Sequence, residues 1–336
     1  MIRIISPGPL TAVQDGGRRG CQSQGYRECG AADMYSLEAA NAMVGNDDLQ
    51  AAALEITISG GVMEFTEPVI FAVTGGDFAL TLDGERVPAH GPVYAGAGSR
   101  LTIGPAASGL RGCLAVYGGI DVPLLLGSRS TDLTCRLGGY RGRALKKGDE
   151  IPVGAYAVRG IRDVEKRRAA LAGRNLLKVE ADRSRLVPSG LGRFFQGERI
   201  RVLRAVKGPQ EEYFTEGAHR TFERSVYTIT LQSDRMGCRL SGPALETVHG
   251  CDIISDGIVG GSVQVSSDGQ PIIMQADHQT TGGYAKIATV ISADLPALAQ
   301  LRPGDKVGFR FVSPKEAVMT VRELQAGLLS LKEVYR

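Results

Sequence analysis

The chain has 336 residues, with 43% hydrophobic and 6% aromatic residues, 45 glycines and no tryptophan. This length allows two domains with separate cores, and the many glycines favour short strands joined by tight turns over a helical bundle. The formal net charge of +3 is too small to indicate a nucleic-acid-binding protein, and no basic stripe alternates with aromatic residues.

The first polar cluster lies in the segment VQDGGRRG at 13–20. It places charged residues and glycine where a core would need apolar side chains. Gln14, Asp15 and Arg18 are therefore predicted to bind substrate. A salt bridge between Asp15 and Arg18 inside the loop is the simpler interpretation of that pair.

A helix is predicted between a capping residue, Asp33, and a terminating glycine, Gly45. Its buried stripe has the spacing i, i+3, i+4, i+7 and consists of Leu37, Ala40, Asn41 and Val44. A buried amide needs a hydrogen bond, so we expect Asn41 to tie the helix to a neighbouring loop, with 14–18 as the first candidate. Asn41 is also a candidate for substrate binding, although most buried amides are structural.

A basic run follows from 159 to 207, with a helix-like piece at 163–172 and a loop at 187–190. A solvated linker explains this run better than a nucleic-acid or membrane surface. Beyond it, Arg235 and Arg239 could hold a carboxylate or phosphate by two-point hydrogen bonding. In a strand their spacing would put both on one face, but ion pairs with Asp234 or Asp305 are an equally good explanation.

The most polar segment of the second half runs from 262 to 284. Strand alternation in SVQVS separates Gln264 from Val263 and Val265. The strand at 272–276 then ends in a loop that offers a carboxylate, an amide, two hydroxyls and two glycines, which favours a small-molecule site over a simple turn. The candidate residues of this segment are Gln264, Asp277, Gln279, Thr280, Thr281, Gly282, Gly283 and Tyr284.

The loop residues have different expected roles. Gly282 and Gly283 permit positive φ and close approach, so that their N–H groups could point at a substrate oxygen. Asp277 is predicted to assist proton transfer and Arg235 to hold an anion, which makes these two the catalytic candidates. His278 is interpreted as an incidental loop residue.

An internal repeat organises the chain, because LKKGDEI at 145–151 recurs as LRPGDKV at 301–307, which is 156 positions later. The same offset aligns the apolar segments 70–73 and 226–229. Two matches at one offset predict a duplicated β domain.

Several long motifs in order carry a family resemblance: VQDGGRRG, GAAD, ANAMVGN, LEITISGG, SDRMGCRLSGPAL, DGQPIIMQADHQTTGGY and AQLRPGDKVGF. Together they resemble the biotin-dependent carboxyltransferase family, which includes the C subunit of 5-oxoprolinase, KipA-type proteins and allophanate hydrolase subunit 2. The resemblance implies a mainly β fold with two tandem cyclophilin-like β-barrel domains and a few short helices. The expected divisions are an N-terminal domain at 1–155, a basic linker at 156–205, a C-terminal domain at 206–315 and a helical tail at 316–336.

The family's substrates share an unreactive N–C=O group. The first functional hypothesis is a subunit of a heteromeric, ATP-dependent 5-oxoprolinase that activates the lactam of 5-oxoproline for opening to glutamate and is inactive alone. One alternative is a carboxyltransferase half that moves carboxylate from carboxybiotin to a urea-like amide. The other is a non-enzymatic, KipA-like binder of a kinase inhibitor.

The cofactor and partner expectations follow from the same resemblance. ATP would be bound by the complex, because the chain has no Walker-type phosphate loop, and biotin would be carried elsewhere, because the chain has no MetLysMet tripeptide. Expected partners are a sister B-type subunit (allophanate hydrolase subunit 1 or KipI-like), a LamB/YcsF-like A-type subunit, and a small amide substrate, with no nucleic acid or membrane.

The location and the thiols complete these expectations. The sequence has neither a signal peptide nor a long apolar run, so we expect a cytoplasmic protein. The six cysteines are scattered without a Cys-x-x-Cys pair, which favours reduced thiols over disulfides or zinc. No metal site is predicted.

Overall fold

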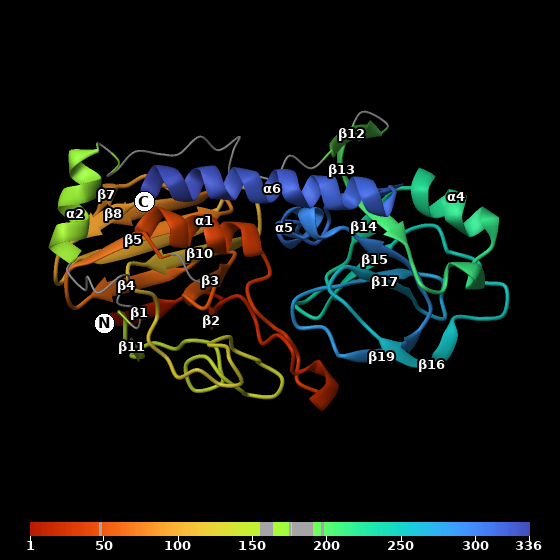
Figure 1. Cartoon of the computed structure of the whole chain (residues 1–336), viewed down its shortest axis with the longest axis horizontal. Coiled ribbons are helices and arrows are strands. Elements are labelled where there is room, and N and C mark those ends of the chain that lie inside the picture. Colours follow the sequence, from red (N-terminus) through yellow and green to blue (C-terminus); the bar gives the residue numbers. More distant parts are fainter. Residues whose placement is uncertain (47–48, 155–163, 175, 177–190, 196–197) are drawn as a thin grey trace. The chain divides into compact units, whose positions relative to one another are not determined.

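The computed structural model describes residues 1–46, 49–154, 164–174, 176, 191–195 and 198–336. They fall into two compact units (Figure 1). The first contains Met1–Arg19, Cys29–Val187 and Ala326–Arg336, and the second contains Gly20–Glu28 and Pro188–Gln325. Much of the predicted linker at 156–205, including the loop at 187–190, lies outside the described residues, so the domain boundaries stay a prediction.

The strands of the first unit form two antiparallel sheets. The six-stranded sheet has the order β11-β1-β4-β9-β6-β7 and the five-stranded sheet has the order β2-β3-β10-β5-β8. The first sheet consists of β1 (Ile2–Pro7), β4 (Gly61–Phe65), β6 (Phe78–Leu82), β7 (Glu85–Arg86), β9 (Arg100–Ala106) and β11 (Glu150–Ile151). The second consists of β2 (Leu10–Gln14), β3 (Ala53–Thr57), β5 (Val69–Gly75), β8 (Val93–Ala95) and β10 (Arg111–Val116).

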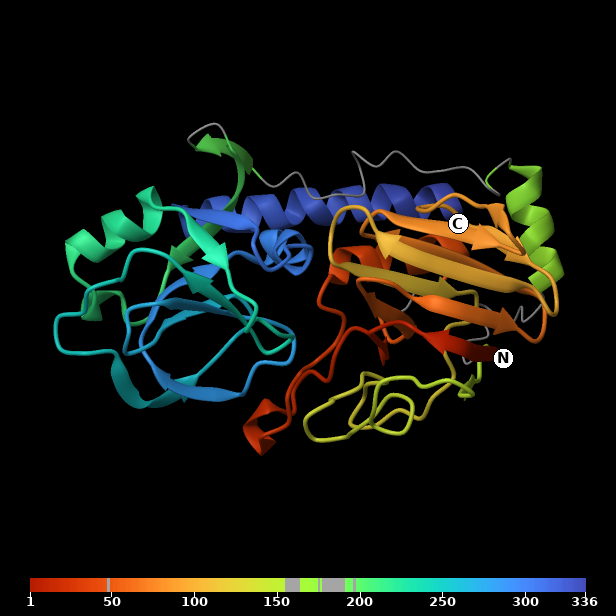
Figure 2. The ribbon, with the colours of Figure 1, turned by 180° about the vertical axis from the view of Figure 1, so that it is seen from behind.

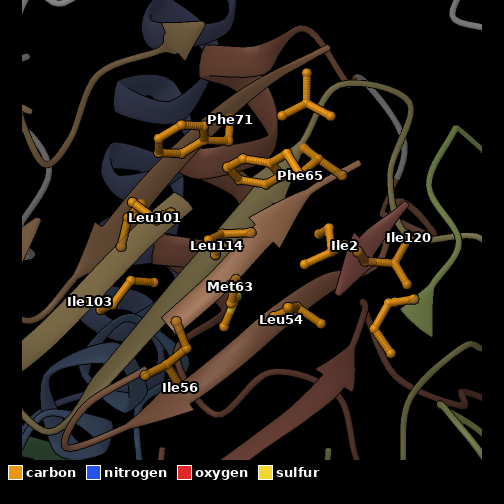
Figure 3. Packing of buried hydrophobic residues seen from close by; sticks show 14 of the residues in the cluster. Ile2, Leu54, Ile56, Met63, Phe65, Phe71, Leu101, Ile103, Leu114 and Ile120 are labelled. Carbon is orange, nitrogen blue, oxygen red and sulfur yellow. The ribbon is translucent and has the colours of Figure 1, made fainter. Parts of the chain in front are cut away.

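The core of the first unit draws apolar side chains from both of these sheets (Figure 3). Phe65 of β4 stacks on Phe71 of β5, with ring centroids 5.3 Å apart. In β1 the buried Ile2 and Ile4 alternate with less buried neighbours, as expected of a strand with one face on the core. Every residue of β10 is buried, because helix α1 (Met34–Val44) covers the side of β5 and β10 away from this core.

Helix α1 begins and ends as its sequence predicts. The carboxylate of Asp33 accepts a hydrogen bond from the backbone N–H of Ser36 at 2.9 Å, which satisfies a free donor of the first turn. Gly45 ends the helix in the left-handed conformation, with φ of 97°. The predicted stripe of Leu37, Ala40, Asn41 and Val44 is buried.

The second unit contains a closed barrel (Figure 2). Its strands follow the order β13-β20-β17-β18-β15-β14-β21, and a parallel pairing between β21 and β13 closes it. These strands are β13 (Glu198–Lys207), β14 (Tyr227–Ile229), β15 (Gly237–Ser241), β17 (Ser262–Val265), β18 (Pro271–Met274), β20 (Lys286–Val290) and β21 (Lys306–Phe311). The predicted mainly β fold is confirmed.

Further elements of the second unit surround this barrel. Strand β12 (Leu191–Phe195) extends the sheet from β13, while β16 (Asp252–Gly257) and β19 (Thr281–Tyr284) form a separate pair. Helix α4 (Glu216–Arg224) packs against β21, where Phe222 stacks on Phe309 with centroids 4.1 Å apart. The remaining helices of the described residues are α2 (Val164–Gly173), α5 (Leu295–Ala299), α6 (Pro314–Tyr335) and the short 3-10 turns Gln22–Gln24, Glu211–Tyr213 and Ser292–Asp294.

The two repeated sequence segments form the same turn. The carboxylate of Asp149 accepts a hydrogen bond from the backbone N–H of Lys146 at 2.7 Å, and the carboxylate of Asp305 accepts one from Arg302 at 2.7 Å. In each turn the preceding glycine has a positive φ, of 85° and 93°, which glycine adopts without the steric cost of a side chain.

The strand match at the same offset is wrong. Strand β5 pairs with β8 and β10, whereas β14 pairs with β15 and β21. The backbone N–H of Ile229 in β14 donates to the carbonyl of Asp305 in the second repeated turn at 3.0 Å. In the first repeated turn the carbonyl of Asp149 accepts the equivalent bond from the backbone N–H of Ile4 in β1 at 2.9 Å. Strand β14 therefore corresponds to β1 and not to β5. Short apolar strands resemble one another, and a match of three apolar residues does not identify a strand's place in a sheet.

Candidate functional site

The two residues predicted to be catalytic bind each other. Nε of Arg235 donates to Oδ2 of Asp277 at 2.8 Å, and Nη2 donates to Oδ1 at 3.0 Å. Their side chains are 7% and 8% exposed, and the backbone N–H of Asp277 donates to the carbonyl of Arg235 at 2.9 Å. This geometry is the two-point arginine–carboxylate pair, so both oxygens of Asp277 already accept hydrogen bonds.

Arg235 and Arg239 do not share a strand face, which was one of the two interpretations of their spacing, and Arg235 forms its ion pair with Asp277 and not with Asp234 or Asp305. Arg235 lies in the turn before β15, where the N–H of Met236 donates to the carboxylate of Asp234 at 2.8 Å. Arg239 lies within β15 and is exposed. Strand alternation therefore applies to only one of the two arginines.

A second group of polar side chains lies on β17 and β20. Gln264 is paired with Lys286 across these antiparallel strands, and residues that face each other in this way point to the same side of a sheet. Both are only 2% exposed. As predicted, Val263 and Val265 instead join the core of the barrel.

Lys286 was missed by the sequence interpretation, although it is among the largest fully buried side chains. Its Nζ donates to Oδ2 of Asp256 at 2.8 Å, and Nε2 of Gln210 donates to the same oxygen at 3.1 Å. These hydrogen bonds, Lys286 first, lower the pKa of Asp256 to about 2. Because Asp256 is half exposed, the buried amine is held close to the surface by an ionised carboxylate.

Gly282 is needed for space rather than for a positive φ. Gly282 and Gly283 both lie in β19, and neither has a positive φ. A methyl group added at Gly282 would lie 2.5 Å from Cδ1 of Ile258 and 2.6 Å from Nε2 of Gln264. A methyl group added at Gly283 would have no atom closer than 3.6 Å. The predicted loop therefore ends in a strand, and Gly282 lets that strand pass against Gln264.

The remaining residues of the predicted loop lie beside this strand. Nε2 of Gln264 donates to the carbonyl of Tyr284 at 3.3 Å, and the amide of Gln279 lies 3.4 Å from the position of a methyl group at Gly282. The carbonyl of Thr280 accepts a hydrogen bond from the backbone of Ile258 at 3.0 Å, and Thr281 is exposed. Two strand pairs thus bring these polar groups together in the second unit.

The N-terminal candidates lie in the first unit and are almost inaccessible: Gln14 and Asp15 are 1% exposed and Arg18 is 0% exposed. Nε2 of Gln14 donates to the carbonyl of Thr131 at 3.1 Å. The carboxylate of Asp15 accepts hydrogen bonds from the hydroxyls of Ser128 and Ser130, both at 2.6 Å.

The expected salt bridge between Asp15 and Arg18 is therefore wrong. Arg18 instead donates to the carbonyl of Leu125 at 3.2 Å and to that of Ser130 at 2.9 Å. Both charged residues hold the segment from Leu125 to Ser130, which is more than 100 positions away in the sequence. Sequence spacing could not reveal this partner.

Asn41 also makes hydrogen bonds that support the fold. Its Nδ2 donates to the carbonyl of Ala51 at 2.9 Å, and its Oδ1 accepts from Asn46 at 2.8 Å. The helix is therefore tied to these two residues and not to the loop at 14–18. This difference arises because Gly45 turns the chain back along α1, which brings Asn46 beside Asn41.

Several other features of the described residues bear on the chemistry. Across the described ranges, no group of three or more His, Cys, Asp or Glu side chains could hold a metal ion. No disulfide is assigned among the six cysteines, all of which lie in the described part of the chain. No helix within those ranges is long and apolar enough to cross a membrane.

The first unit also contains a hollow of about 450 Å³. It is lined by Asp77, Phe78, Leu80, Arg86, Val87, Pro88 and Ala89. None of the residues predicted from the sequence lines it. The group around Gln264 and Lys286 therefore remains the candidate site.

Comparison with known proteins identifies the family. The model of the carboxyltransferase domain, subdomains A and B, matches residues 24–311. The chain belongs to this carboxyltransferase family. The resemblance of the sequence motifs is thereby confirmed.

Individual relatives refine this assignment. The chain is 38% identical over 325 residues to the C subunit of 5-oxoprolinase from Escherichia coli, covering 97% of this chain and 96% of the relative. The solved structure of Kluyveromyces lactis urea amidolyase is 27% identical, with a TM-score of 0.84, and the match covers 98% of this chain and 20% of that one. The solved protein TTHA0988 is 30% identical with a TM-score of 0.73, and the match covers 92% of this chain and 55% of that one.

Proposed function

We propose that the chain is a subunit of a heteromeric, ATP-dependent 5-oxoprolinase that opens the lactam of 5-oxoproline to glutamate. The observation that carries the proposal is the match to the C subunit of the E. coli enzyme, which extends over 97% of one chain and 96% of the other. The proposed partners are the sister B-type subunit and a LamB/YcsF-like A-type subunit. We propose the cytoplasm as the site of this complex.

The polar group of the second unit suits an amide substrate. Lys286 provides a fixed cationic donor and Gln264 a fixed amide on the same side of the barrel. Preorganised donors stabilise a carbonyl oxygen that gains negative charge in the transition state. Their burial strengthens this effect, because electrostatic interactions are stronger where water is excluded.

The reaction would proceed through an activated lactam oxygen. That oxygen takes the γ-phosphoryl group of ATP as the bond to ADP breaks, and water then adds to the lactam carbon. The carbon–nitrogen bond of this adduct breaks as the nitrogen takes a proton, which leaves γ-glutamyl phosphate. A second water molecule then adds to the acyl carbon, and the carbon–oxygen bond to phosphate breaks, which releases glutamate and phosphate. ATP would be bound by the complex, since this chain has no Walker-type loop.

The two arginines have different roles in this proposal. Arg235 positions the end of β18, because its guanidinium is bound to Asp277. Arg239, exposed on β15, is the candidate for the substrate carboxylate or a phosphate group. Asp277 is then a positioning residue and not the proton carrier.

The second candidate function is carboxyl transfer from carboxybiotin on another protein to a urea-like amide. The likeness to urea amidolyase over 98% of this chain, with a TM-score of 0.84, favours it. The same donors would hold the oxygen of that amide. Biotin would be attached to the other protein, because this chain has no MetLysMet tripeptide.

Reconstitution distinguishes the two functions. The chain is combined with its sister subunits, and glutamate release from 5-oxoproline is measured with and without ATP. We expect turnover from the full complex and none from the isolated chain. Carboxylation of urea with a biotin carboxylase and a biotinylated carrier, without 5-oxoproline turnover, would establish the second function instead.

Two glycine variants test the location of the site. In the reconstituted complex Gly282→Ala should lower turnover about tenfold or more, because the new methyl group would displace Gln264 or Ile258. Gly283→Ala is the matched control, since its methyl group meets nothing closer than 3.6 Å. Equal turnover in both variants would remove this group from the site.

A further inference from the structure

Gln210 of the second unit contacts Lys286 in two ways. Its Oε1 accepts a hydrogen bond from the backbone N–H of Lys286 at 3.2 Å. Its Nε2 donates at 3.1 Å to Oδ2 of Asp256, which is the same oxygen that accepts from Nζ of Lys286 at 2.8 Å. A side-chain amide suits both contacts, because its oxygen accepts and its nitrogen donates. One side chain thus binds the backbone of the lysine and the carboxylate that holds its ammonium group.

The segment that leads to Gln210 lies directly against the backbone of Lys286. The backbone N–H of Gly208 donates to the carbonyl of Ile287 at 2.9 Å. A methyl group added at Gly208 would lie 2.1 Å from the carbonyl oxygen of Lys286, so only glycine permits this approach. On the other side, the backbone N–H of Tyr213 donates to the carbonyl of Gln210 at 3.1 Å. The backbone of Gln210 is therefore held between two fixed contacts.

Gln210 also fixes the orientation of the Asp256 carboxylate. Asp256 is half exposed on β16, and β16 pairs with β19 in a sheet separate from the barrel. Oδ1 of Asp256 accepts from the backbone N–H of Gly257 at 2.7 Å, while Oδ2 accepts from Gln210 and Lys286. Ion pairs with an exposed partner are weak when nothing else orders them. Three donors from three parts of the chain supply that order here.

The ammonium of Lys286 keeps donors for a substrate. An ammonium group has three N–H donors, and within the described part of the chain its acceptor is Oδ2 of Asp256. A donor has to lie within about 0.5 Å of its productive position, and a displacement of about 1 Å costs about 100-fold in rate. The groups that fix this flexible side chain therefore determine how well it acts.

We propose that Gln210 is a positioning residue of the candidate site, which holds the ammonium of Lys286, through Asp256 and through the backbone, where it donates to the oxygen of the amide substrate. The inference rests on the proposed function, because the substrate oxygen is that of the proposed reaction. Gln210 acts on the lysine and not on the substrate. Its partners lie 46 and 76 positions away in the sequence.

The first test measures how well Lys286 is held in the isolated chain. Acetic anhydride acetylates lysines, and mass spectrometry gives the rate at each of them, with the exposed Lys147 as internal reference. Gln210→Met keeps the length of the side chain and removes both hydrogen bonds, so acetylation of Lys286 should rise several-fold. Asp256→Asn shows the rate without the charged partner. Wild-type acetylation of Lys286 in Gln210→Met would overturn the inference.

Gln270→Met is the matched control for this measurement. Nε2 of Gln270 donates to the carbonyl of Gly242 at 3.1 Å, and its Oε1 accepts from the N–H of Gly242 at 2.9 Å. This variant therefore also loses two side-chain hydrogen bonds in the second unit, but neither involves Asp256 or Lys286. Acetylation of Lys286 should stay at the wild-type rate. An equal rise in both glutamine variants would indicate general loosening and contradict the inference.

The second test measures turnover of 5-oxoproline in the reconstituted complex. Gln210→Met should lower kcat about tenfold or more, while KM stays within about twofold, because the lysine acts on an oxygen that gains charge in the transition state. Gln270→Met should keep wild-type turnover. Unchanged kcat in Gln210→Met, or a higher KM with unchanged kcat, would overturn the positioning role.

Gln210→Glu separates this role from folding. Glutamate keeps an acceptor for the backbone N–H of Lys286 but places a second negative charge beside Asp256, which competes for the ammonium. We expect a folded variant whose kcat falls at least as far as that of Gln210→Met. Wild-type kcat in Gln210→Glu would contradict the inference, and this variant decides alone if Gln210→Met does not fold.

The two proposals fail in different ways. If the wild-type complex carboxylates urea and releases no glutamate from 5-oxoproline, the proposed 5-oxoprolinase function is contradicted, and acetylation of Lys286 and the kcat of urea carboxylation test Gln210 instead. If the wild-type complex turns over 5-oxoproline and Gln210→Met matches it in acetylation and kcat, only the positioning inference is overturned.

Discussion

Asp277 directs both carboxylate oxygens at the guanidinium of Arg235 inside the second unit. When one partner of a buried ion pair is removed, the other keeps an uncompensated charge, which costs about 3–5 kcal/mol. A carboxylate in this position supports the turn before β15 and the end of β18 at the same time. Its contribution to the free energy of unfolding should therefore be large.

The variant Asp277→Asn should lower the free energy of unfolding by about 3 kcal/mol, because Arg235 would lose its charged partner in a buried position. Urea denaturation measures this loss. In a double-mutant cycle with Arg235→Met, the double variant should be less destabilised than the sum of the single variants. Unchanged stability with a collapse of turnover would instead restore the acid–base role suggested by the sequence.

Lys286 shows why part of the site could not be predicted. The alternation of SVQVS correctly separated Gln264 from the core valines. The burial of Lys286 depends on Asp256, which lies 30 residues away on another strand. No local sequence pattern predicts a carboxylate partner at that distance, and lysine is rarely buried without a charged partner.

The pair formed by Asp256 and Lys286 should make stability depend on pH. The folded-state pKa of Asp256 is about 2, below the value of about 3.9 for an unfolded chain. The stabilisation is therefore complete above about pH 5 and is lost as the pH falls from about 4 to about 2. The difference in melting temperature between wild type and Asp256→Asn should shrink over that range.

Asp252→Asn is the control for this measurement, because Asp252 is an exposed aspartate on the same strand β16. The difference in melting temperature between the wild type and Asp252→Asn should change less between pH 4 and pH 2 than the difference between the wild type and Asp256→Asn. If the difference in melting temperature between the wild type and Asp256→Asn stays constant down to pH 2, the assigned ion pair is contradicted.

Individual elements differed in how well the sequence specified them. Helix α1 was predictable because its start and stop depend on neighbours within one turn, Asp33 and Gly45. Strand β19 was not, since its two glycines suggested an open loop. This segment forms a strand because it pairs with β16 and because Gly282 approaches Gln264 closely. Both are contacts between segments that are separated in the sequence.

The repeated turns provide a matched pair for measurement. Asp149 and Asp305 both accept a backbone hydrogen bond within the turn, but Asp149 also binds Arg143 at 2.7 and 2.8 Å. Arg143 is the first cause that lowers the pKa of Asp149. We expect Asp149→Ala to reduce the free energy of unfolding by about 1–2 kcal/mol more than Asp305→Ala. Thermal denaturation of both variants tests this, and equal losses would show that the Arg143 contact adds nothing.

At the scale of the whole molecule, the described residues form two hydrophobic cores, one in each compact unit. The sequence predicted this number from the repeat, although it could not show that the first unit divides its strands between two sheets. Whether a sheet closes into a barrel depends on which of its edge strands pair with each other. The pattern of apolar residues in the sequence does not determine that pairing. Chains with two units often unfold in more than one step.

Calorimetry should therefore resolve two transitions. Phe65→Ala in the first core and Phe222→Ala in the second should each destabilise one unit by about 3–5 kcal/mol, because both side chains are 0% exposed. Each variant should move a different transition. A single transition that both variants shift equally would show that the two cores unfold as one.

The long-range partners of the Asp15 and Arg18 side chains lie between 107 and 115 positions further along the chain. A ribosome that adds about 5–20 residues per second takes roughly 5–23 s to cover that interval. During this time both charges have to remain hydrated, and α1 and the early strands are made before the segment that anchors their N-terminal edge. Synthesis thus leaves these hydrogen bonds of the first unit unmade until residue 130 has emerged, and a pause before that point would prolong the exposure of its N-terminal edge to proteases and chaperones.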